Sequence, residues 1–116
     1  DKQYGSFIVH NGINIKTRTG TPVRSIFNGK VLYTGELEGY GNLVIIGHGK
    51  DFHSLYGHLD RIDTKPNQVV QVGDIIGLSG DTGSLVGETL YLEMRQKGKP
   101  IEPLRWFKKA KKNSGI

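Results

Sequence analysis

The four histidines are the first candidates for chemistry, because a neutral imidazole binds zinc and changes its charge near neutral pH. They are His10, His48, His53 and His58. None has another histidine two residues away, the spacing that would point two ligands to the same face of a strand. The chain has no cysteine, so a disulfide and a thiolate metal site are both excluded. The histidines by themselves therefore give no strong metal-ligand signal.

A strand-like run near the C-terminus carries most of the remaining polar chemistry. Because side chains alternate across a strand, Leu90, Leu92 and Met94 share one face. The other face carries Thr89, Tyr91, Glu93 and Arg95. We expect the apolar face in the core and the polar face toward solvent or a groove. The same parity predicts that Tyr56 and His58 share a face, as do His10, Gly12 and Asn14.

Three motifs resemble those of the lysostaphin/LytM zinc endopeptidases, in that family's order, and the likeness extends roughly from His10 through Trp106. The family's His-x-Gly-x-Asp corresponds to Val9-His10-Asn11-Gly12-Ile13-Asn14-Ile15. Its catalytic-histidine motif corresponds to Tyr56-Gly57-His58-Leu59. Its Gly-x-His-x-His-x-Glu corresponds to Gly87-Glu88-Thr89-Leu90-Tyr91-Leu92-Glu93. Asn14 thus stands at the ligand aspartate, Thr89 at the first histidine of the pair and Tyr91 at the second.

Within that family the chain most resembles the degenerate LytM domains of EnvC-type murein hydrolase activators. The shared stretches are Gly39-Tyr40-Gly41, His48-Gly49-Lys50, Ser54-Leu55-Tyr56-Gly57, Leu90-Tyr91-Leu92-Glu93-Met94-Arg95 and Gly98-Lys99-Pro100-Ile101-Glu102-Pro103. This resemblance implies a β-domain with an open groove and a periplasmic, division-site location. It also implies a role in switching on zinc amidases that split septal peptidoglycan.

Normal zinc catalysis is not expected, because it needs about three protein ligands and an activated water. Of the ligand positions that the resemblance implies, only His10 is intact. Asn14 offers a neutral carbonyl oxygen, and the Tyr91 phenol has an ordinary pKa of about 10. His58 remains at the catalytic position, but its partner has become Thr89. We therefore predict a pseudoenzyme with no cofactor and a lost zinc site.

The same positions predict a groove that binds a partner protein. Its expected residues are Asn11, Tyr40, Leu43, Tyr56, His58, Tyr91, Glu93 and Arg95. Tyrosine supplies a large contact area with a polar tip, and arginine can fork onto a carboxylate. Asn11 and Leu43 are included only through the resemblance. His48, in a Gly-His-Gly turn, is expected to have a local role, and His53 to lie on a strand surface.

The fold class predicted is all-β, a LytM-type β-sheet domain with a duplicated hybrid motif. The seventeen glycines favour many tight turns and short strands. The clearest strand-like runs are Pro22–Ile26, Gly29–Leu37, Asn42–Gly47, His53–Leu59, Asp74–Ser79 and Thr89–Gln96. A short terminal helix is expected from Pro103 to Lys111, with Leu104 and Phe107 inward. Lipoyl carriers share the hybrid motif, but no lysine here lies in the setting that a carrier needs.

At 116 residues, the chain is expected to be a single degenerate LytM domain over 1–116, with a basic tail at 108–116. It begins without methionine and is read as the C-terminal part of a longer protein, for which the resemblance implies a signal and a coiled coil upstream. No apolar stretch approaches the roughly 20 residues that span a bilayer. The net charge of +5 favours acidic surroundings, but no recognised nucleic-acid motif accompanies it.

Three functions are compatible with these residues. The first is a non-catalytic activator whose groove binds a regulatory segment of a peptidoglycan amidase. The second is a module that binds peptidoglycan without cutting it. The third is a residual zinc endopeptidase with a rebuilt site that uses His10, His58 and a neighbour such as His53 or Glu93. We favour the activator.

Overall fold

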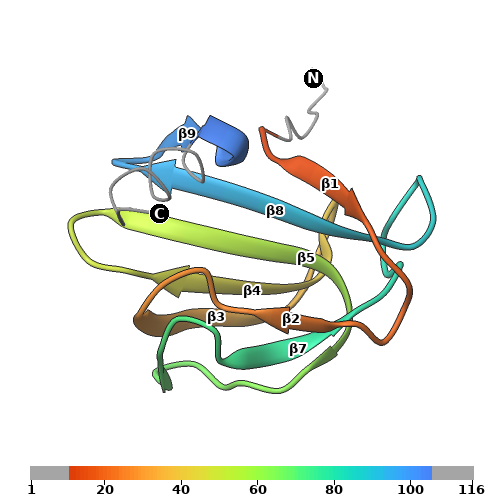
Figure 1. Cartoon of the computed structure of the whole chain (residues 1–116), viewed down its shortest axis with the longest axis horizontal. Coiled ribbons are helices and arrows are strands. Elements are labelled where there is room, and N and C mark those ends of the chain that lie inside the picture. Colours follow the sequence, from red (N-terminus) through yellow and green to blue (C-terminus); the bar gives the residue numbers. More distant parts are fainter. Residues whose placement is uncertain (1–10, 106–116) are drawn as a thin grey trace, which may run out of the picture.

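The computed structural model describes residues 11–105, which form one antiparallel β-sheet (Figure 1). Nine strands lie in this part of the chain: β1 (Ile13–Lys16), β2 (Pro22–Arg24), β3 (Gly29–Leu37), β4 (Gly41–Gly47), β5 (Phe52–Ile62), β6 (Val69–Val70), β7 (Ile75–Ser79), β8 (Thr89–Gln96) and β9 (Lys99–Ile101). His10, Trp106 and the basic segment 108–116 lie outside the described residues.

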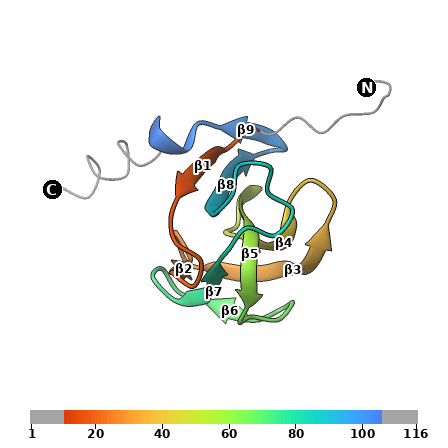
Figure 2. The ribbon, with the colours of Figure 1, turned by 90° about the vertical axis from the view of Figure 1, so that its right-hand side faces the viewer.

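The sheet is strongly curled, so that its short strands face the long ones. The hydrogen-bonded order is β1-β8-β5-β4-β3-β6, with β9 also paired to β8. β7 pairs with both β5 and β2, and this brings β2 into the same sheet. In Figure 2 the strands close most of a ring, with β6 and β7 opposite β1 and β8. The long strands β4, β5 and β8 therefore have one face inside this ring and one outside.

Both faces of the long strands are buried, and alternation along each strand divides the apolar residues between them. The main core, inside the ring, consists of Val23, Val31, Val44, Ile46, Tyr56, Leu59, Val70, Ile76 and Leu92. The outer cluster, on the opposite face, consists of Tyr40, Leu43, Leu55 and Tyr91. Neighbours in sequence thus belong to different clusters, as Leu55 and Tyr56 do.

The all-β prediction is confirmed, and the six expected strands are all present: two have the expected ends, and four have ends shifted by one to three residues. β6 and β9 were not predicted, because with two and three residues they are too short for a clear alternation. Residues 103–105 are helical, as predicted for the start of the terminal helix. Leu104, however, is 55% exposed rather than inward, while the adjacent Pro103 is fully buried. Among the described residues, no helix is long and apolar enough to cross a membrane.

A series of polar contacts connects the half-buried His48 to the buried side chains of Ser54 and Tyr56 in and beside the main core. His48 Nδ1 lies 2.8 Å from the carbonyl oxygen of Asn28, and its Nε2 lies 2.7 Å from Ser54 Oγ. Ser54 Oγ is in turn hydrogen-bonded to the Tyr56 hydroxyl at 2.7 Å. The backbone amide of Ile26 donates to the same hydroxyl at 3.1 Å. His48 therefore has a structural role, but its side chain contacts Asn28 and Ser54 rather than the turn in which a local role was expected.

The pKa of His48 is lowered from 6.5, chiefly by burial and also by nearby His53, against the opposing contact with Asn28. The folded state therefore resists protonation more than the unfolded chain, and stability is lost as pH falls below about 6.5. We expect His48→Gln to remove this component, so that the difference in unfolding free energy between wild type and variant shrinks on acidification. Urea unfolding at pH about 7.5 and about 5 measures this difference. An equal loss of stability in both proteins would contradict the assignment.

Candidate functional site

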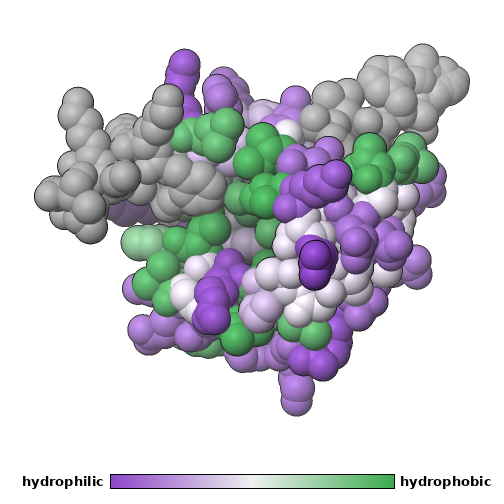
Figure 3. Space-filling model, turned by 45° about the vertical axis from the view of Figure 1, so that its right-hand side comes forward, coloured by the Kyte–Doolittle hydropathy of each residue, from purple (hydrophilic) through white to green (hydrophobic). Residues whose placement is uncertain are grey.

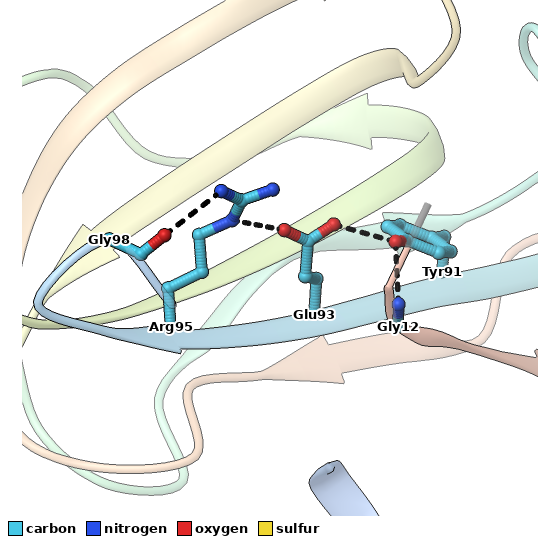
Figure 4. Close-up of polar contacts among 5 residues, drawn as sticks. All are labelled: Gly12, Tyr91, Glu93, Arg95 and Gly98. Carbon is cyan, nitrogen blue, oxygen red and sulfur yellow. Dashed lines mark hydrogen bonds and ion pairs between the residues drawn. The ribbon is translucent and has the colours of Figure 1, made fainter. Parts of the chain in front are cut away.

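The hydroxyl of Tyr91 joins the start of β1 to the middle of β8. It accepts a hydrogen bond of 2.8 Å from the backbone amide of Gly12 and donates one of 2.6 Å to Glu93 Oε1 (Figure 4). The approach requires glycine at position 12, because a Cβ there would lie 2.2 Å from the carbonyl oxygen of Leu92 and 2.8 Å from the Tyr91 ring. The phenol hydroxyl therefore acts both as a hydrogen-bond acceptor and as a hydrogen-bond donor.

Glu93 extends this series of hydrogen bonds from Tyr91 toward the surface. Its side chain is fully buried, and its second oxygen accepts a charge-assisted hydrogen bond from Arg95 Nε. The Arg95 side chain is 33% exposed, and its Nη1 contacts the carbonyl oxygen of Gly98 at 3.4 Å. In Figure 4 the three side chains lie in a row along β8, ending at Arg95. We call Tyr91, Glu93 and Arg95 the relay.

The relay holds Tyr91 in its neutral form. Burial raises the pKa of the Tyr91 phenol far above its usual value, and the hydrogen bond to Glu93 raises it further. The same carboxylate raises the pKa of the Arg95 guanidinium. Tyr40 also has a raised pKa, first through burial and then through Glu93, with Arg95 acting in the opposite direction. In this structure Tyr91 is therefore a neutral phenol that donates its proton to Glu93.

His58 lies beside the relay in an unusual backbone conformation. Its φ of 61° is in the left-handed region, and its amide donates to the carbonyl oxygen of Tyr40 at 2.7 Å. The ring lies 2.8 Å through Nδ1 from the carbonyl oxygen of Thr82 and packs edge-on to Tyr91, with ring centroids 6.1 Å apart. A left-handed residue changes the side-chain parity of a strand, which matters for the prediction about Tyr56.

The prediction that Tyr56 and His58 share a face is wrong. Tyr56 points into the main core, whereas His58 packs against Tyr91 of the outer cluster. The physical reason is the left-handed backbone at His58, accompanied by register shifts of the flanking β4–β5 and β5–β7 pairings. Leu59 consequently returns to the main core, three residues rather than two after Tyr56. In this structure the Tyr56 side chain is a core element.

The expected orientation of the polar face of β8 also needs correction. Thr89, Tyr91 and Glu93 are at most 2% exposed, so they face neither solvent nor an open surface. They are buried because this face packs in the outer cluster and pairs its polar atoms internally; Thr89 Oγ1, for example, donates to the carbonyl oxygen of Ile15 at 3.3 Å. Arg95 alone among the four is partly exposed.

Most of the predicted site residues do lie together. The outer cluster contains Tyr40, Leu43 and Tyr91, and His58, Glu93 and Arg95 contact Tyr91 directly or through the relay. Asn11 is exposed beside Gly12, and Asn14 is exposed on β1 opposite Tyr91. Sequence reasoning missed Tyr33 and Ile45, which are half-buried against the outer cluster. The alternation of β4, with Val44 inward, could have placed Ile45 beside Leu43.

Zinc is the metal implied by the resemblance to lysostaphin-type peptidases, and the described residues do not fit it. No group of three or more His, Cys, Asp or Glu side chains in the part from 11 to 105 is placed to hold a metal ion. The Tyr91 hydroxyl, at a ligand position, is instead engaged with Gly12 and Glu93. Because His10 lies outside this part, the loss of zinc binding stays a prediction.

The profile of Peptidase family M23 matches residues 8–103, most of the chain and all three motifs. The chain belongs to peptidase family M23. This confirms the LytM-type resemblance inferred from the sequence.

Two similar bacterial proteins have informative names: one is named as a lipoprotein homolog and the other as a murein hydrolase activator. A protein of Pseudomonas aeruginosa called lipoprotein NlpD/LppB homolog is 40% identical over 100 residues, covering 85% of this chain and 33% of the relative. The murein hydrolase activator NlpD of Escherichia coli K12 is 39% identical over 99 residues, covering 84% of this chain and 26% of the relative. The chain thus matches a third or less of the length of each of these proteins.

Solved structures place the fold among M23 enzymes. The catalytic domain of the antimicrobial peptidase lysostaphin from Staphylococcus simulans superposes with a TM-score of 0.79 at 27% identity. The match covers 86% of this chain and 80% of that domain. The M23 fold is therefore preserved around the relay, in which the Tyr91 hydroxyl is hydrogen-bonded to Gly12 and Glu93.

Removing one oxygen from Tyr91 tests the bridge between β1 and β8. We expect Tyr91→Phe to lower the unfolding free energy by about 1–3 kcal/mol, because Gly12 and Glu93 each lose a buried hydrogen-bond partner. The matched control is Tyr33→Phe, whose exposed hydroxyl contacts only the carbonyl oxygen of Glu36 among the described residues; there the change should stay within about 0.5 kcal/mol. Urea unfolding measures both. Equal losses of unfolding free energy in the two variants would show that the bridge between β1 and β8 adds no stability.

Metal analysis tests the pseudoenzyme assignment directly. After metal-free purification, re-addition of zinc and dialysis, we expect the wild-type domain to retain far less than one zinc per chain, because the Tyr91 hydroxyl is already hydrogen-bonded to Gly12 and Glu93. The triple variant Asn14→Asp, Thr89→His and Tyr91→His restores the family residues and is the positive control. Elemental analysis by mass spectrometry gives the stoichiometry. One tightly held zinc in wild type, lost in His10→Ala, would overturn the assignment.

Proposed function

We propose that this M23 domain is a non-catalytic activator of a peptidoglycan amidase and acts outside the cytoplasm. The observation that carries the proposal is the engagement of the Tyr91 hydroxyl with Gly12 and Glu93 at a ligand position of the family. A domain of this kind keeps the shape of the peptidase without its chemistry. The name of the Escherichia coli relative, murein hydrolase activator, supports the same role.

The partner segment is proposed to lie along the outer cluster, near the exposed end of the relay. Tyr33 and Ile45 are half-buried there and retain surface that a partner can cover. Arg95 is the charged group at this border, with one third of its side chain exposed. Its Nε donates to Glu93 and its Nη1 contacts the carbonyl oxygen of Gly98, so a partner carboxylate or carbonyl would be bound through the remaining N–H groups of the guanidinium.

Binding activates an enzyme only when the binder prefers the active conformation over the resting one. The proposed domain would therefore bind a regulatory segment of the amidase in the position that this segment adopts when the enzyme is open. A buried relay suits this task, because it presents Arg95 in a fixed orientation rather than as a flexible side chain.

An extracytoplasmic, division-site location forms part of the proposal. The Pseudomonas aeruginosa relative is named as a lipoprotein, and a Haemophilus influenzae relative that covers 84% of this chain is named as an outer membrane antigenic lipoprotein. Peptidoglycan, the material acted on by the enzyme in the proposal, lies in the same compartment. A net charge of +5 is compatible with such acidic surroundings.

The primary test is dye release from labelled sacculi, with the domain alone, a resting amidase from the same organism alone, and both together. Release only in the mixture is expected. Release by the domain alone would overturn the non-catalytic assignment. If neither the domain nor the mixture releases dye while the domain sediments with sacculi in moderate salt, the domain is a peptidoglycan-binding module instead.

Arg95→Ala is expected to reduce activation by the domain at least about tenfold, because it removes the charged group at the border of the outer cluster. Since the change also leaves Glu93 buried without its cation, Arg95→Lys is assayed in parallel, and circular dichroism checks the fold of both. The control is Arg61→Ala. Arg61 is an exposed arginine of β5 and forms an ion pair with Asp63, which follows that strand. Activation at the wild-type level by both folded Arg95 variants would rule out this surface.

A further inference from the structure

The loop at residues 80–88, which joins β7 to β8, is anchored firmly at its base. Thr82 Oγ1 donates to the carbonyl oxygen of Leu59 at 2.7 Å and accepts from the amide of Asn42 at 3.1 Å. The carbonyl oxygen of Thr82 lies 2.8 Å from His58 Nδ1. Gly41 packs so closely that a Cβ there would lie 1.9 Å from the same oxygen. In Figure 2 this loop faces the viewer.

The tip of loop 80–88 displays two adjacent apolar side chains. The amide of Ser84 donates to the carbonyl oxygen of Asp81 at 2.9 Å, and the amide of Val86 donates to Ser84 Oγ at 3.1 Å. Between these bonds Leu85 is 101% exposed, and Val86 is 67% exposed. These two hydrogen bonds restrain the backbone that presents them, which reduces the entropy that this backbone would lose when a partner covers the tip.

A basic hollow lies next to this tip. Lys16, Thr17 and Arg18, at the end of β1, line it together with Val86 and Glu88, and its volume is about 390 Å³. The Glu88 carboxylate accepts a hydrogen bond of 2.7 Å from the amide of Thr19, which lowers the pKa of Glu88. The hollow therefore combines two cations with one carboxylate, which is hydrogen-bonded to the Thr19 amide and also interacts with the charge of Arg18. Figure 3 shows hydrophobic and hydrophilic residues interspersed on this side of the molecule.

We propose that Leu85 and Val86, with the hollow at Lys16 and Arg18, form a second contact surface for an acidic, amphipathic segment of a partner protein. An apolar side chain of that segment packs on the loop tip, and its carboxylate enters the hollow. The two cations of the hollow outnumber its one carboxylate, and this excess of positive charge favours an acidic segment. The apolar tip needs an apolar counterpart. The assignment of the segment to the amidase rests on the function proposed above; the surface is separate from Arg95.

The test measures binding of the domain to the resting amidase by biolayer interferometry at low and high salt. Leu85→Ser and the pair Lys16→Glu with Arg18→Glu should each weaken binding at least about tenfold. The charge pair should also remove most of the salt dependence, since exposed charges are screened by salt. Controls of the same chemistry lie elsewhere on the surface: Leu32→Ser, with Leu32 48% exposed on β3, and Lys30→Glu with Lys65→Glu. These should change binding by less than about twofold.

The outcomes separate this inference from the proposed function. If the wild-type domain binds and activates the amidase while Leu85→Ser and the Lys16/Arg18 variant bind equally well, the second surface is wrong and the activator role stands. If wild type neither binds nor activates the amidase, the proposed function fails and takes this assignment with it. A loss in the control variants as large as in the test variants would also overturn the surface.

Discussion

The hydrogen bond between the Gly12 amide and the Tyr91 hydroxyl is the interaction on which the site depends. It fixes the entry of β1 beside β8, and it aims the phenol proton at Glu93. Glu93 can stay fully buried only because that proton and the Arg95 guanidinium satisfy its two oxygens. The Tyr91 hydroxyl thus holds the start of β1 in place and helps to satisfy the buried Glu93 carboxylate. It does so at a position where the resemblance to M23 peptidases implies a metal ligand.

The outer cluster packs around the Tyr91 ring and supports this arrangement. Tyr91 packs against Tyr40, with ring centroids 5.7 Å apart, and against the edge of the His58 ring. Aromatic pairs in such tilted geometries contribute beyond their buried area. The phenol therefore brings apolar contacts that an imidazole ligand would not need, and its polar tip is paired internally. The site has become part of a second core, with only its Arg95 end left at the surface.

The sequence was sufficient for the fold because its strands alternate clearly between turn signals, and its motifs were sufficient for the family. It was not sufficient to predict which side chains are buried and which face solvent. Alternation correctly separated Leu92 from Tyr91, but a sheet buried on both faces hides polar residues that alternation assigns to solvent. The left-handed backbone at His58 was equally hidden, since any histidine can occupy an extended strand. Tyr56 was misplaced for that reason alone.

β1 has only four residues, and all of its pairings among residues 11–105 are with β8. So short a strand is expected to detach as one cooperative unit rather than residue by residue. Gly12 lies just before it, and Lys16 is its last residue. A ligand that holds the Lys16 end down therefore also keeps the Gly12 amide on the Tyr91 hydroxyl, and the converse follows by thermodynamic linkage. The two ends of β1 are in this way coupled sites, joined by the folding equilibrium of a single strand.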